Sequence, residues 1–332
     1  MAIEAAGNPQ KIGFIGLGRM GRPMALRLVA AGHRLACHDV SPMATAPLCE
    51  AGAIVCQTAA EVAQSSGIVI TMLPDGQTVR EVLIGKSAVA AAMPRGAMVI
   101  DMSSSAPLGT RALGNELQAL GLSMIDAPVS GGVARAADGA LAIMAGGEAQ
   151  DIARARPVLE AMGSRVFHTG ALGSGHAVKA LNNYVSAAGL TAACEAAIVA
   201  QAFGIDTATL VDVLNASTGR NNTTEVKMKP QILSGAFSSG FAMALMAKDV
   251  ATAADLAQAL GCGTSGTASQ ARLWAEALAM LGHHADHTEM YRFLQATGEQ
   301  AERLGAAGSK SGGEHGKIGE DRSGADGADR PR

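Results

Sequence analysis

The sequence has few aromatic residues, little net charge and no cysteine pattern. Aromatic side chains make up 3% of the 332 residues, so a core must be packed largely by aliphatic residues and methionine. A formal net charge of -3 gives no electrostatic reason to expect nucleic acid or an anionic membrane surface as a partner. The five cysteines are odd in number and show neither a CxxC motif nor metal-ligand spacing, which argues against a disulfide framework and a zinc site.

A targeting signal is also lacking. The first ten residues show neither the charged start nor the apolar core of a signal peptide, and no apolar stretch long enough to span a bilayer stands apart from the domain pattern. We therefore expect a cytoplasmic protein that does not enter a membrane. His283, His284 and His287 could suggest a metal, but no acidic or cysteine partner pattern accompanies them. They indicate a solvated loop, and no metal is expected.

What the sequence does contain is a glycine-rich turn directly after an apolar strand. Residues 12–15 run into the pattern Gly16-x-Gly18-x-x-Gly21, and a helix is expected from about Met20. The first glycine of such a pattern permits a tight turn, the second lets a pyrophosphate approach the backbone, and the third lets the helix pack closely on the strand. The cofactor-binding residues expected in this loop are Gly16, Leu17, Gly18, Arg19, Met20 and Gly21.

Asp39 supplies the second part of this signature. It ends the strand candidate 35–39, where a carboxylate can accept hydrogen bonds from the ribose hydroxyls of NAD and repel the 2'-phosphate of NADP. No arginine follows it immediately. The alternative is a strand–helix turn that holds no nucleotide. Strand, glycines, helix and acid together favour an NAD site, with NADP the less favoured cofactor.

The remaining pattern predicts an α/β chain that begins with a Rossmann domain, a doubly wound parallel sheet with crossover helices. Apolar strand candidates lie at residues 68–73, 98–101 and 123–127, and helix-length segments at 59–65, 77–92 and 106–120. Further strands at 141–144 and 165–168, with a helix at 149–162 between them, are expected to extend the sheet.

From Gly175 onward the sequence shows only helical patterns, at residues 178–203, 207–216, 249–260, 264–281 and 288–304. The first of these is long enough to bridge two domains or a subunit interface, so a homodimer or homotetramer is expected. The expected limits are 9–170 for the NAD-binding domain, 171–307 for an all-helical substrate and oligomerisation domain, and 308–332 for a disordered tail. The tail has too few apolar side chains to offset its ordering entropy.

Ligands of doubly wound sheets bind beyond the carboxyl ends of the strands, so the residues after each strand are candidates for a site. Residues 71–74 close one strand and Ser103 follows the next, although a strand end and a helix N-cap explain them equally well. Ser130-Gly131-Gly132 follows a third strand and presents a hydroxyl and backbone N–H groups that suit a carboxylate. An ordinary turn is the alternative there.

Lys179 and Asn183 lie four residues apart, and hence on one face, near the start of the long helix. Both are unusual in an otherwise apolar run. A helical lysine more commonly extends to solvent or pairs with an acid. A lysine partly buried beside a cationic nicotinamide would instead have its pKa lowered toward working pH, which makes it a usable general acid/base.

Together these motifs resemble the beta-hydroxyacid dehydrogenase family, which includes 3-hydroxyisobutyrate dehydrogenase and tartronate semialdehyde reductase. The match covers roughly residues 11–304. Its motifs are Gly13-Phe-Ile-Gly-Leu-Gly, Thr71-Met-Leu-Pro, Ile100-Asp-Met-Ser-Ser, Asp126-Ala-Pro-Val-Ser-Gly-Gly, Lys179-x-x-Asn-Asn183 and Lys248-Asp249. The resemblance implies a Rossmann domain followed by an all-α C-terminal domain like that of 6-phosphogluconate dehydrogenase.

The resemblance also implies roles for single residues. Lys179 is the catalytic acid/base, Asn183 orients the substrate, and Ser130, Gly131 and Gly132 hold its carboxylate. Lys248 reaches the cofactor from the helical domain, and Leu73, Pro74 and Ser103 line the cofactor site. The implied reaction is reversible hydride transfer between NAD and the hydroxyl-bearing carbon of a small 3-hydroxy acid or semialdehyde, 3-hydroxyisobutyrate-like or tartronate semialdehyde/glycerate-like.

Two further features bear on the function. Residues 217–225 are expected to contribute to the substrate pocket. The Asn-Asn-Thr-Thr at positions 221–224 is more polar than the corresponding segment of 3-hydroxyisobutyrate dehydrogenases, which makes a more polar substrate attractive. The rivals to a hydroxyacid dehydrogenase are a noncatalytic dinucleotide-binding protein and a reductase of the related imine-reducing class. The presence of Lys179 speaks against both. A 6-phosphogluconate dehydrogenase would need basic residues for a sugar phosphate and a larger C-terminal domain, and neither is evident.

Overall fold

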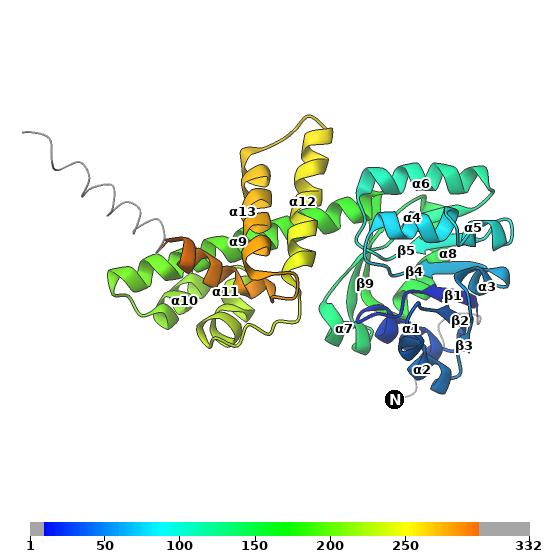
Figure 1. The fold of residues 1–332 in the computed structure, drawn as a ribbon, viewed down its shortest axis with the longest axis horizontal. Helices are drawn as coiled ribbons and strands as arrows, with labels where there is room; N and C mark the ends of the chain where they lie inside the picture. The colour runs from blue at the N-terminus through cyan, green and yellow to red at the C-terminus, as the bar shows by residue number, and fades with distance from the viewer. Residues whose placement is uncertain (1–9, 299–332) are drawn as a thin grey trace, which may run out of the picture.

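The structure, a computed structural model, describes residues 10–298 and consists of a sheet-containing part followed by a helical part (Figure 1). The strands of the first part are β1 (Lys11–Ile15), β2 (Arg34–His38), β3 (Ile54–Val55), β4 (Ile68–Thr71), β5 (Met98–Asp101), β6 (Ser123–Asp126), β7 (Val129–Ser130), β8 (Leu141–Gly146) and β9 (Gly163–Gly170). Its helices are α1 (Gly21–Ala30), α2 (Pro42–Glu50), α3 (Ala59–Gln64), α4 (Gly76–Ile84), α5 (Val89–Ala92), α6 (Pro107–Ala119), α7 (Gly132–Asp138) and α8 (Ala149–Glu160).

The strands form one sheet in the order β3-β2-β1-β4-β5-β6-β8-β7, with β9 paired to β8. From β3 to β6 all neighbours are parallel. Thr71 of β4 is level with Ile15 of β1 and with Asp101 of β5, and Asp101 is level with Asp126 of β6. The carboxyl ends of these strands therefore meet at one edge of the sheet, where α/β proteins bind ligands.

Apolar side chains project from both faces of this sheet and are covered by helices. Ile12 and Phe14 lie in one buried cluster with residues of α1 and α8, and Val69 and Val99 lie in another with residues of α3, α4 and α6. Alternate residues of a strand point to opposite faces, so these strands are apolar on both sides. The arrangement confirms a doubly wound Rossmann-type domain. The sheet is not parallel throughout, because β8 runs antiparallel to β6 and β7.

The helical part is built around one long helix, α9 (Ser174–Phe203), against which α12 and α11 pack. The other elements are α10 (Thr207–Ala216), α11 (Asn222–Val226), the π-helix η1 (Met228–Leu233), α12 (Met243–Ala259), α13 (Ser265–Leu281) and the 3-10 helix η2 (His287–Glu289), followed by helical residues 290–298. Their core surrounds Trp274, the sole tryptophan, which is fully buried. The expected all-α C-terminal domain is confirmed.

Helix α9 is long and apolar enough to cross a membrane, judged by length and composition alone. Core helices of soluble proteins pass the same test, and 39% of its most apolar window is already buried within the chain. In Figure 1 the helix starts against the sheet and runs through the helical part. Within the chain it contacts β8, α11, α12 and α13.

Several elements differ from the sequence prediction. The single helix expected at 77–92 is wrong, because α4 ends before Gly85 and Ala88 takes a left-handed φ of 45° before α5 begins. Helix α12 begins at Met243 rather than at residue 249. The short elements β3, β7, α7 and η1 were not expected. The domain limits 9–170 and 171–307 stay predictions, since residue 9 and residues 299–307 lie outside the described residues, as does the expected tail 308–332.

Candidate active site

The glycine loop between β1 and α1 has the spaces that a dinucleotide requires. Gly16 has a φ of 97°, and a Cβ atom there would overlap the Met72 carbonyl oxygen. A Cβ atom on Gly21 would overlap the Gly16 carbonyl oxygen, so only glycine lets α1 start this close to the strand. Around Gly18, in contrast, nothing lies within 4 Å of the Cβ position. The loop therefore fits a pyrophosphate, with its point of approach at Gly18.

Asp39 lies directly beside this loop, after β2. Its carboxylate accepts a hydrogen bond from the backbone N–H of Leu17 at 2.6 Å and another from that of Ser41 at 2.8 Å. An ionised carboxylate has about four acceptor positions, so the side chain can also accept from ribose hydroxyls. Asp39 thus holds the glycine loop against β2 and places a negative charge beside it. The exposed Arg19 and the half-buried Met20 complete the loop.

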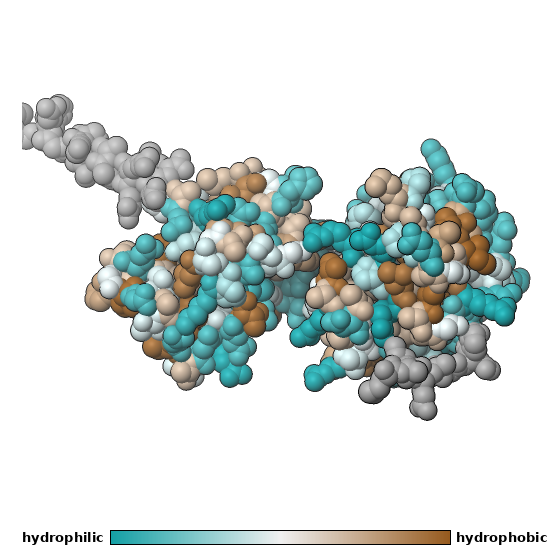
Figure 2. All heavy atoms as spheres, turned by 90° about the horizontal axis from the view of Figure 1, so that it is seen from below, coloured by the Kyte–Doolittle hydropathy of each residue, from teal (hydrophilic) through white to brown (hydrophobic). Residues whose placement is uncertain are grey.

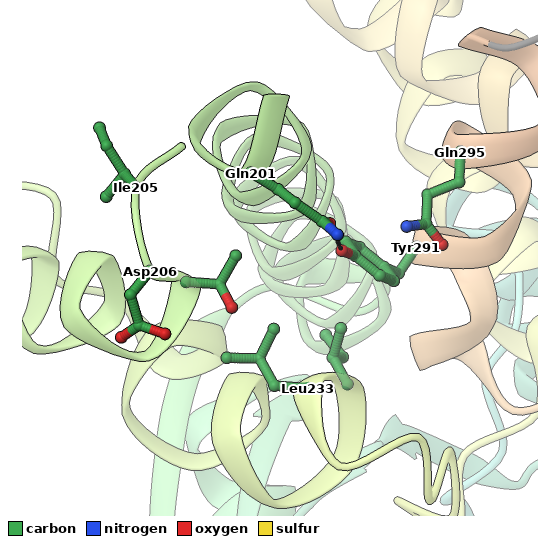
Figure 3. A pocket seen from close by; sticks show the side chains of 8 residues that line it. Gln201, Ile205, Asp206, Leu233, Tyr291 and Gln295 are labelled. Atoms are coloured by element: carbon green, nitrogen blue, oxygen red, sulfur yellow. Dashed lines mark hydrogen bonds between the residues drawn. The ribbon is translucent and has the colours of Figure 1, made fainter. Parts of the chain in front are cut away.

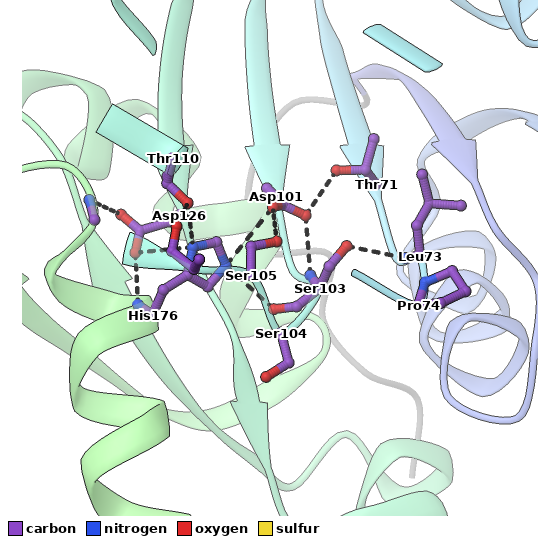
Figure 4. Close-up of polar contacts among 12 residues, drawn as sticks. Thr71, Leu73, Pro74, Asp101, Ser103, Ser104, Ser105, Thr110, Asp126 and His176 are labelled. Carbon is purple, nitrogen blue, oxygen red and sulfur yellow. Dashed lines mark hydrogen bonds and ion pairs between the residues drawn. The ribbon is translucent and has the colours of Figure 1, made fainter. Parts of the chain in front are cut away.

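Asp101 organises the loop that follows β5 (Figure 4). Its buried carboxylate accepts from the Thr71 hydroxyl at 2.9 Å, from the Ser103 N–H at 3.0 Å and from the Ser105 hydroxyl at 2.9 Å. The Ser103 hydroxyl in turn accepts from the N–H of Leu73 at 2.9 Å. The loops after β4 and β5 are therefore bonded to each other. They bring Leu73 and Ser103 together at the carboxyl edge of the sheet.

The turn Ser130-Gly131-Gly132 joins β7 to α7. The φ angle is 138° at Gly131 and 72° at Gly132, in the region that disfavours residues with a side chain. Nothing lies within 4 Å of a Cβ position on Gly132. A Cβ atom on Gly131 would instead lie 2.8 Å from Cδ of Arg135. The turn is therefore open at Gly132, where a carboxylate could approach the backbone.

Lys179 lies in the second turn of α9, and its side chain is partly buried. Burial lowers the pKa of its ammonium group from the ordinary value; the negative charge of Asp249 opposes this shift, and the positive charge of Lys248 adds to it. A lowered pKa makes the amine easier to deprotonate near neutral pH. The environment of Lys179 therefore suits a group that both accepts and donates a proton.

Asn183 is buried one turn after Lys179 and is bonded to α12. Its amide nitrogen donates to Asp249 at 2.6 Å, and its amide oxygen accepts from Asn182 at 3.0 Å. The other oxygen of Asp249 accepts from the Ser104 hydroxyl at 2.6 Å. The Asp249 carboxylate therefore fixes the orientation of the Asn183 amide and connects the helical part to the loop after β5.

Lys248, the neighbour of Asp249, makes a second connection between the two parts. Its Nζ atom donates to the carbonyl oxygens of Pro74 and Ser104, each at 2.8 Å. These carbonyls belong to the loops after β4 and β5, which were expected to line the cofactor. The structure thus brings Leu73, Pro74, Ser103 and Lys248 together at the same edge of the sheet.

The polar segment 221–224 forms the start of α11. The Asn221 side chain accepts from the N–H groups of Thr223 and Thr224, and the Thr224 hydroxyl accepts from the Asn221 N–H. Thr223 and Thr224 are both buried. Helix capping therefore accounts for Asn221 and Thr224. The buried Thr223 hydroxyl has no hydrogen-bond partner among the described residues, and the expectation of a polar substrate stays a prediction.

The histidines at 283, 284 and 287 do not form one solvated group. His283 and His284 are exposed, but His287 is buried and its ring contacts Ser239, Phe241 and Lys227. The prediction of a solvated loop is therefore wrong for His287, which packs at the start of α12. Among residues 10–298 no three His, Cys, Asp or Glu side chains are arranged to hold a metal ion.

A hollow of about 430 Å³ lies elsewhere in the helical part (Figure 3). It is lined by Gln201, Ile205, Asp206, Thr207, Ile232, Leu233, Tyr291 and Gln295. Gln201 follows Lys179 by 22 residues of α9, about 33 Å at the rise of an α-helix. The hollow is therefore separate from the candidate active site. That site lies where α9 leaves the sheet. Figure 2 shows that the molecule has two lobes joined by a narrower region.

Comparison with known proteins agrees with this geometry. Residues 11–170 match the family described as the NAD binding domain of 6-phosphogluconate dehydrogenase, and residues 173–294 match the NAD-binding family of NADP-dependent 3-hydroxyisobutyrate dehydrogenase. The chain is 39% identical to the 3-sulfolactaldehyde reductase of Escherichia coli, over 75% of this chain and 84% of that protein. It is 37% identical to the NAD-dependent L-serine dehydrogenase of Pseudomonas aeruginosa, over 77% of this chain and 88% of that protein.

A solved structure extends the likeness to the whole fold. The 3-hydroxyisobutyrate dehydrogenase of Mycobacterium tuberculosis, solved with L-serine, superposes with a TM-score of 0.81 at 34% identity. The alignment covers 86% of this chain and 99% of that one. It therefore includes both the sheet part and the helical part. The chain belongs to the beta-hydroxyacid dehydrogenase family, whose members are nicotinamide-dependent oxidoreductases acting on the hydroxyl groups of small acids.

Proposed function

We propose that the chain is an NAD-dependent dehydrogenase of small 3-hydroxy acids in which Lys179 is the general acid/base. The observation that carries this proposal is the place of Lys179: partly buried, with a lowered pKa, at the start of the helix that leaves the carboxyl edge of the sheet. When bound, NAD accepts a hydride in oxidation and its reduced form returns one in reduction. Lys179 takes the hydroxyl proton in the first direction and gives it back in the second.

The other site residues bind and orient. Ser130, Gly131 and Gly132 hold the substrate carboxylate through the serine hydroxyl and backbone N–H groups. Asn183, held by Asp249, uses its remaining amide hydrogen on the substrate. The cofactor is held by the glycine loop, by Asp39 at the ribose, and by Leu73, Pro74, Ser103 and Lys248 at the nicotinamide end.

The substrate class follows from what related proteins are named for. L-serine and 3-hydroxyisobutyrate both carry a primary hydroxyl on the carbon next to one that bears a carboxylate, and they differ only in the substituent on that second carbon. The proposed substrates therefore carry a CH₂OH group and a carboxylate on the same carbon. Tartronate semialdehyde is the corresponding aldehyde with a hydroxyl group as the substituent. 3-Sulfolactaldehyde is similar to it but carries a CH₂–SO₃⁻ group in place of the carboxylate.

The test is a substrate panel followed by the absorbance of reduced nicotinamide. 3-Hydroxyisobutyrate, L-serine and glycerate are offered with NAD and with NADP, and tartronate semialdehyde and 3-sulfolactaldehyde with the reduced cofactors. We expect at least one substrate to reach a kcat/KM of about 10⁴ M⁻¹s⁻¹ or more with the NAD couple. Cofactor binding without turnover of any panel member would favour the noncatalytic alternative. Turnover of a cyclic imine alone would favour the imine-reducing class.

We also propose that the chain forms a homodimer or homotetramer in the cytoplasm. One face of α9 carries apolar residues that are exposed in the single chain: Val178, Leu181, Val185, Val199 and Phe203. Their spacing places them on one side of the helix, and Phe203 is 83% exposed. A contiguous apolar face of this kind is typical of a subunit interface. Light scattering after size-exclusion chromatography measures the subunit number, and a monomer would contradict the proposal.

A further inference from the structure

His176 is a buried histidine at the junction between α9 and the sheet (Figure 4). It is the third residue of α9, and only 1% of its surface is exposed. Its Nε2 atom donates to the Ser103 carbonyl oxygen at 3.2 Å, and its Nδ1 atom lies 2.8 Å from the Thr110 hydroxyl. One ring therefore joins the start of α9 to the loop after β5 and to α6.

Asp126, which ends β6, fixes the backbone of the same turn. Its two carboxylate oxygens accept from the N–H groups of Gly173 and His176, each at 2.7 Å. A Cβ atom on Gly175 would overlap the Met144 carbonyl oxygen, so only glycine lets the helix start approach β8 this closely. The first turn of α9 is thus held through its backbone by Asp126 and through a side chain by His176.

The His176 ring is also enclosed by two buried carboxylates. Its Nε2 atom lies 3.7 Å from Asp101 and its Nδ1 atom 3.6 Å from Asp126. Asp101 is the residue that binds the loops after β4 and β5 to each other. Burial raises the pKa of Asp126, and the His176 ring opposes this shift. The ring therefore sits in a polar network that reaches three strands of the sheet and leaves it little freedom to rotate.

His176, Lys179 and Asn183 lie at positions i, i+3 and i+7, on one face of α9. A rotation of the helix start would therefore displace Lys179 and Asn183 together. We propose that His176 is a positioning residue, which fixes the rotation of α9 and so directs Lys179 and Asn183 at the substrate. The inference rests on the proposed function, in which Lys179 exchanges the hydroxyl proton. A displacement of about 1 Å at a reacting group can cost about 10²-fold in rate.

The experiment compares His176→Ala, His176→Gln and Leu190→Ala with the wild type, using 3-hydroxyisobutyrate and L-serine as substrates. Leu190 is fully buried in α9 but lies away from the junction, so its truncation destabilises the helix without touching the network. We expect His176→Ala to lower kcat about 10- to 100-fold while the Kd for NAD changes less than about twofold. A glutamine amide can still donate to the Ser103 carbonyl, so His176→Gln should recover much of the rate.

Leu190→Ala should keep kcat within about twofold of the wild type at a temperature where all variants are folded, although its Tm falls. If His176→Ala does not fold, Thr110→Val removes a ring partner at nearly constant volume and should lower kcat by at least about threefold. A kcat within about twofold of the wild type in the folded His176→Ala protein would overturn the inference. If that variant does not fold, the same result in Thr110→Val would overturn it.

A double-mutant cycle separates this inference from the proposed function. If His176 acts through Lys179 and Asn183, adding His176→Ala to Lys179→Ala should lower the residual rate by a smaller factor than it lowers kcat in the wild-type background, because only the orientation of Asn183 is then left to disturb. A further loss equal to that in the wild-type background would mean that His176 acts independently of Lys179, and would contradict the inference alone. Full turnover by Lys179→Ala itself would contradict the proposed function.

Discussion

The Asp249 carboxylate accepts a 2.6 Å hydrogen bond from the side-chain amide of Asn183. The same carboxylate accepts from Ser104, and its neighbour Lys248 donates to the carbonyls of Ser104 and Pro74. The loop after β5 is thus hydrogen-bonded to α12 through Ser104 and to α9 through the bond between His176 and Ser103. Asp249 therefore belongs both to the connection between the two parts of the chain and to the electrostatic surroundings of Lys179.

The first prediction concerns the pH dependence of the wild type. Oxidation requires the unprotonated amine of Lys179, so kcat should rise with pH through the pKa of this lysine and then level off. Reduction requires the protonated form, so its kcat should fall over the same range. Because burial lowers the pKa of Lys179, the rise of kcat in oxidation and its fall in reduction should both occur at a lower pH than the pKa of an ordinary lysine. Profiles of kcat against pH in both directions test this. A kcat that changes with pH in the same sense for oxidation and reduction would contradict it.

The second prediction is that Asp249→Asn shifts the pH dependence of kcat to lower pH in both directions. The negative charge of Asp249 raises the pKa of Lys179 against the effect of burial, and the substitution removes that charge. The shape of the side chain is kept, so the bond to Asn183 can still form. Asp255→Asn is a suitable control, because Asp255 lies on the same helix but is exposed. An unchanged midpoint in Asp249→Asn, or an equal shift in both variants, would remove Asp249 from the electrostatics of the site.

The third prediction uses two glycines of the cofactor loop as a matched pair. Gly18→Ala should leave Tm within about 2 °C of the wild type, because nothing lies within 4 Å of the new methyl group. The methyl should nevertheless obstruct the pyrophosphate and weaken NAD binding by about tenfold or more. Gly21→Ala should lower Tm clearly, because its methyl would overlap the Gly16 carbonyl. Thermal melts with and without NAD measure both effects, and unchanged NAD binding in Gly18→Ala would count against the assigned loop.

The fourth prediction is that the wild type prefers NAD over NADP because of the charge of Asp39. In Asp39→Asn an amide oxygen can still accept from the N–H groups of Leu17 or Ser41, but the repulsion of a 2'-phosphate is lost. The ratio of kcat/KM for NAD to that for NADP should therefore fall, mainly because activity with NADP rises. A wild type that favours NADP, or a ratio unchanged by the substitution, would show that Asp39 does not select the cofactor.

Much of the Rossmann part could be predicted because its signals are local. The turn at Gly16, the approach at Gly18 and the packing at Gly21 each follow from a requirement of the backbone at that position. The buried strands are indicated by short continuous apolar runs, and the longer helices by apolar residues at helical spacing. Two-residue strands such as β3 and the short helix α7 are too brief to show a period, and the break at Ala88 depends on a backbone angle that alanine does not signal.

The contacts that hold the candidate site together could not be predicted, because they join residues far apart in the chain. Asp249 and Asn183 are 66 residues apart, and Ser104 and Asp249 are 145 apart. His176 carried one usable signal, a histidine inside an apolar helix start behind a glycine loop, but its partners at Ser103 and Thr110 appear only in the fold. Similarly, the polar residues 221–224 indicated a pocket from sequence, and the structure shows that Asn221 and Thr224 cap a helix.

The last prediction is that Lys179→Ala abolishes turnover and leaves NAD binding nearly intact. Lys179 is on α9, whereas the adenosine half of the cofactor is expected at Asp39, which follows β2, and at the glycine loop between β1 and α1. Loss of a positioned general acid/base typically costs about 10²- to 10⁴-fold in rate, and loss of the ammonium's hydrogen bond to the reacting oxygen adds to it. Since the substitution also removes a charge from a partly buried place, stability should not fall by more than about 1 kcal/mol. Fluorescence titration with NAD and steady-state kinetics on the same folded protein separate binding from chemistry. A variant that retains more than about a tenth of the wild-type kcat would exclude Lys179 as the acid/base.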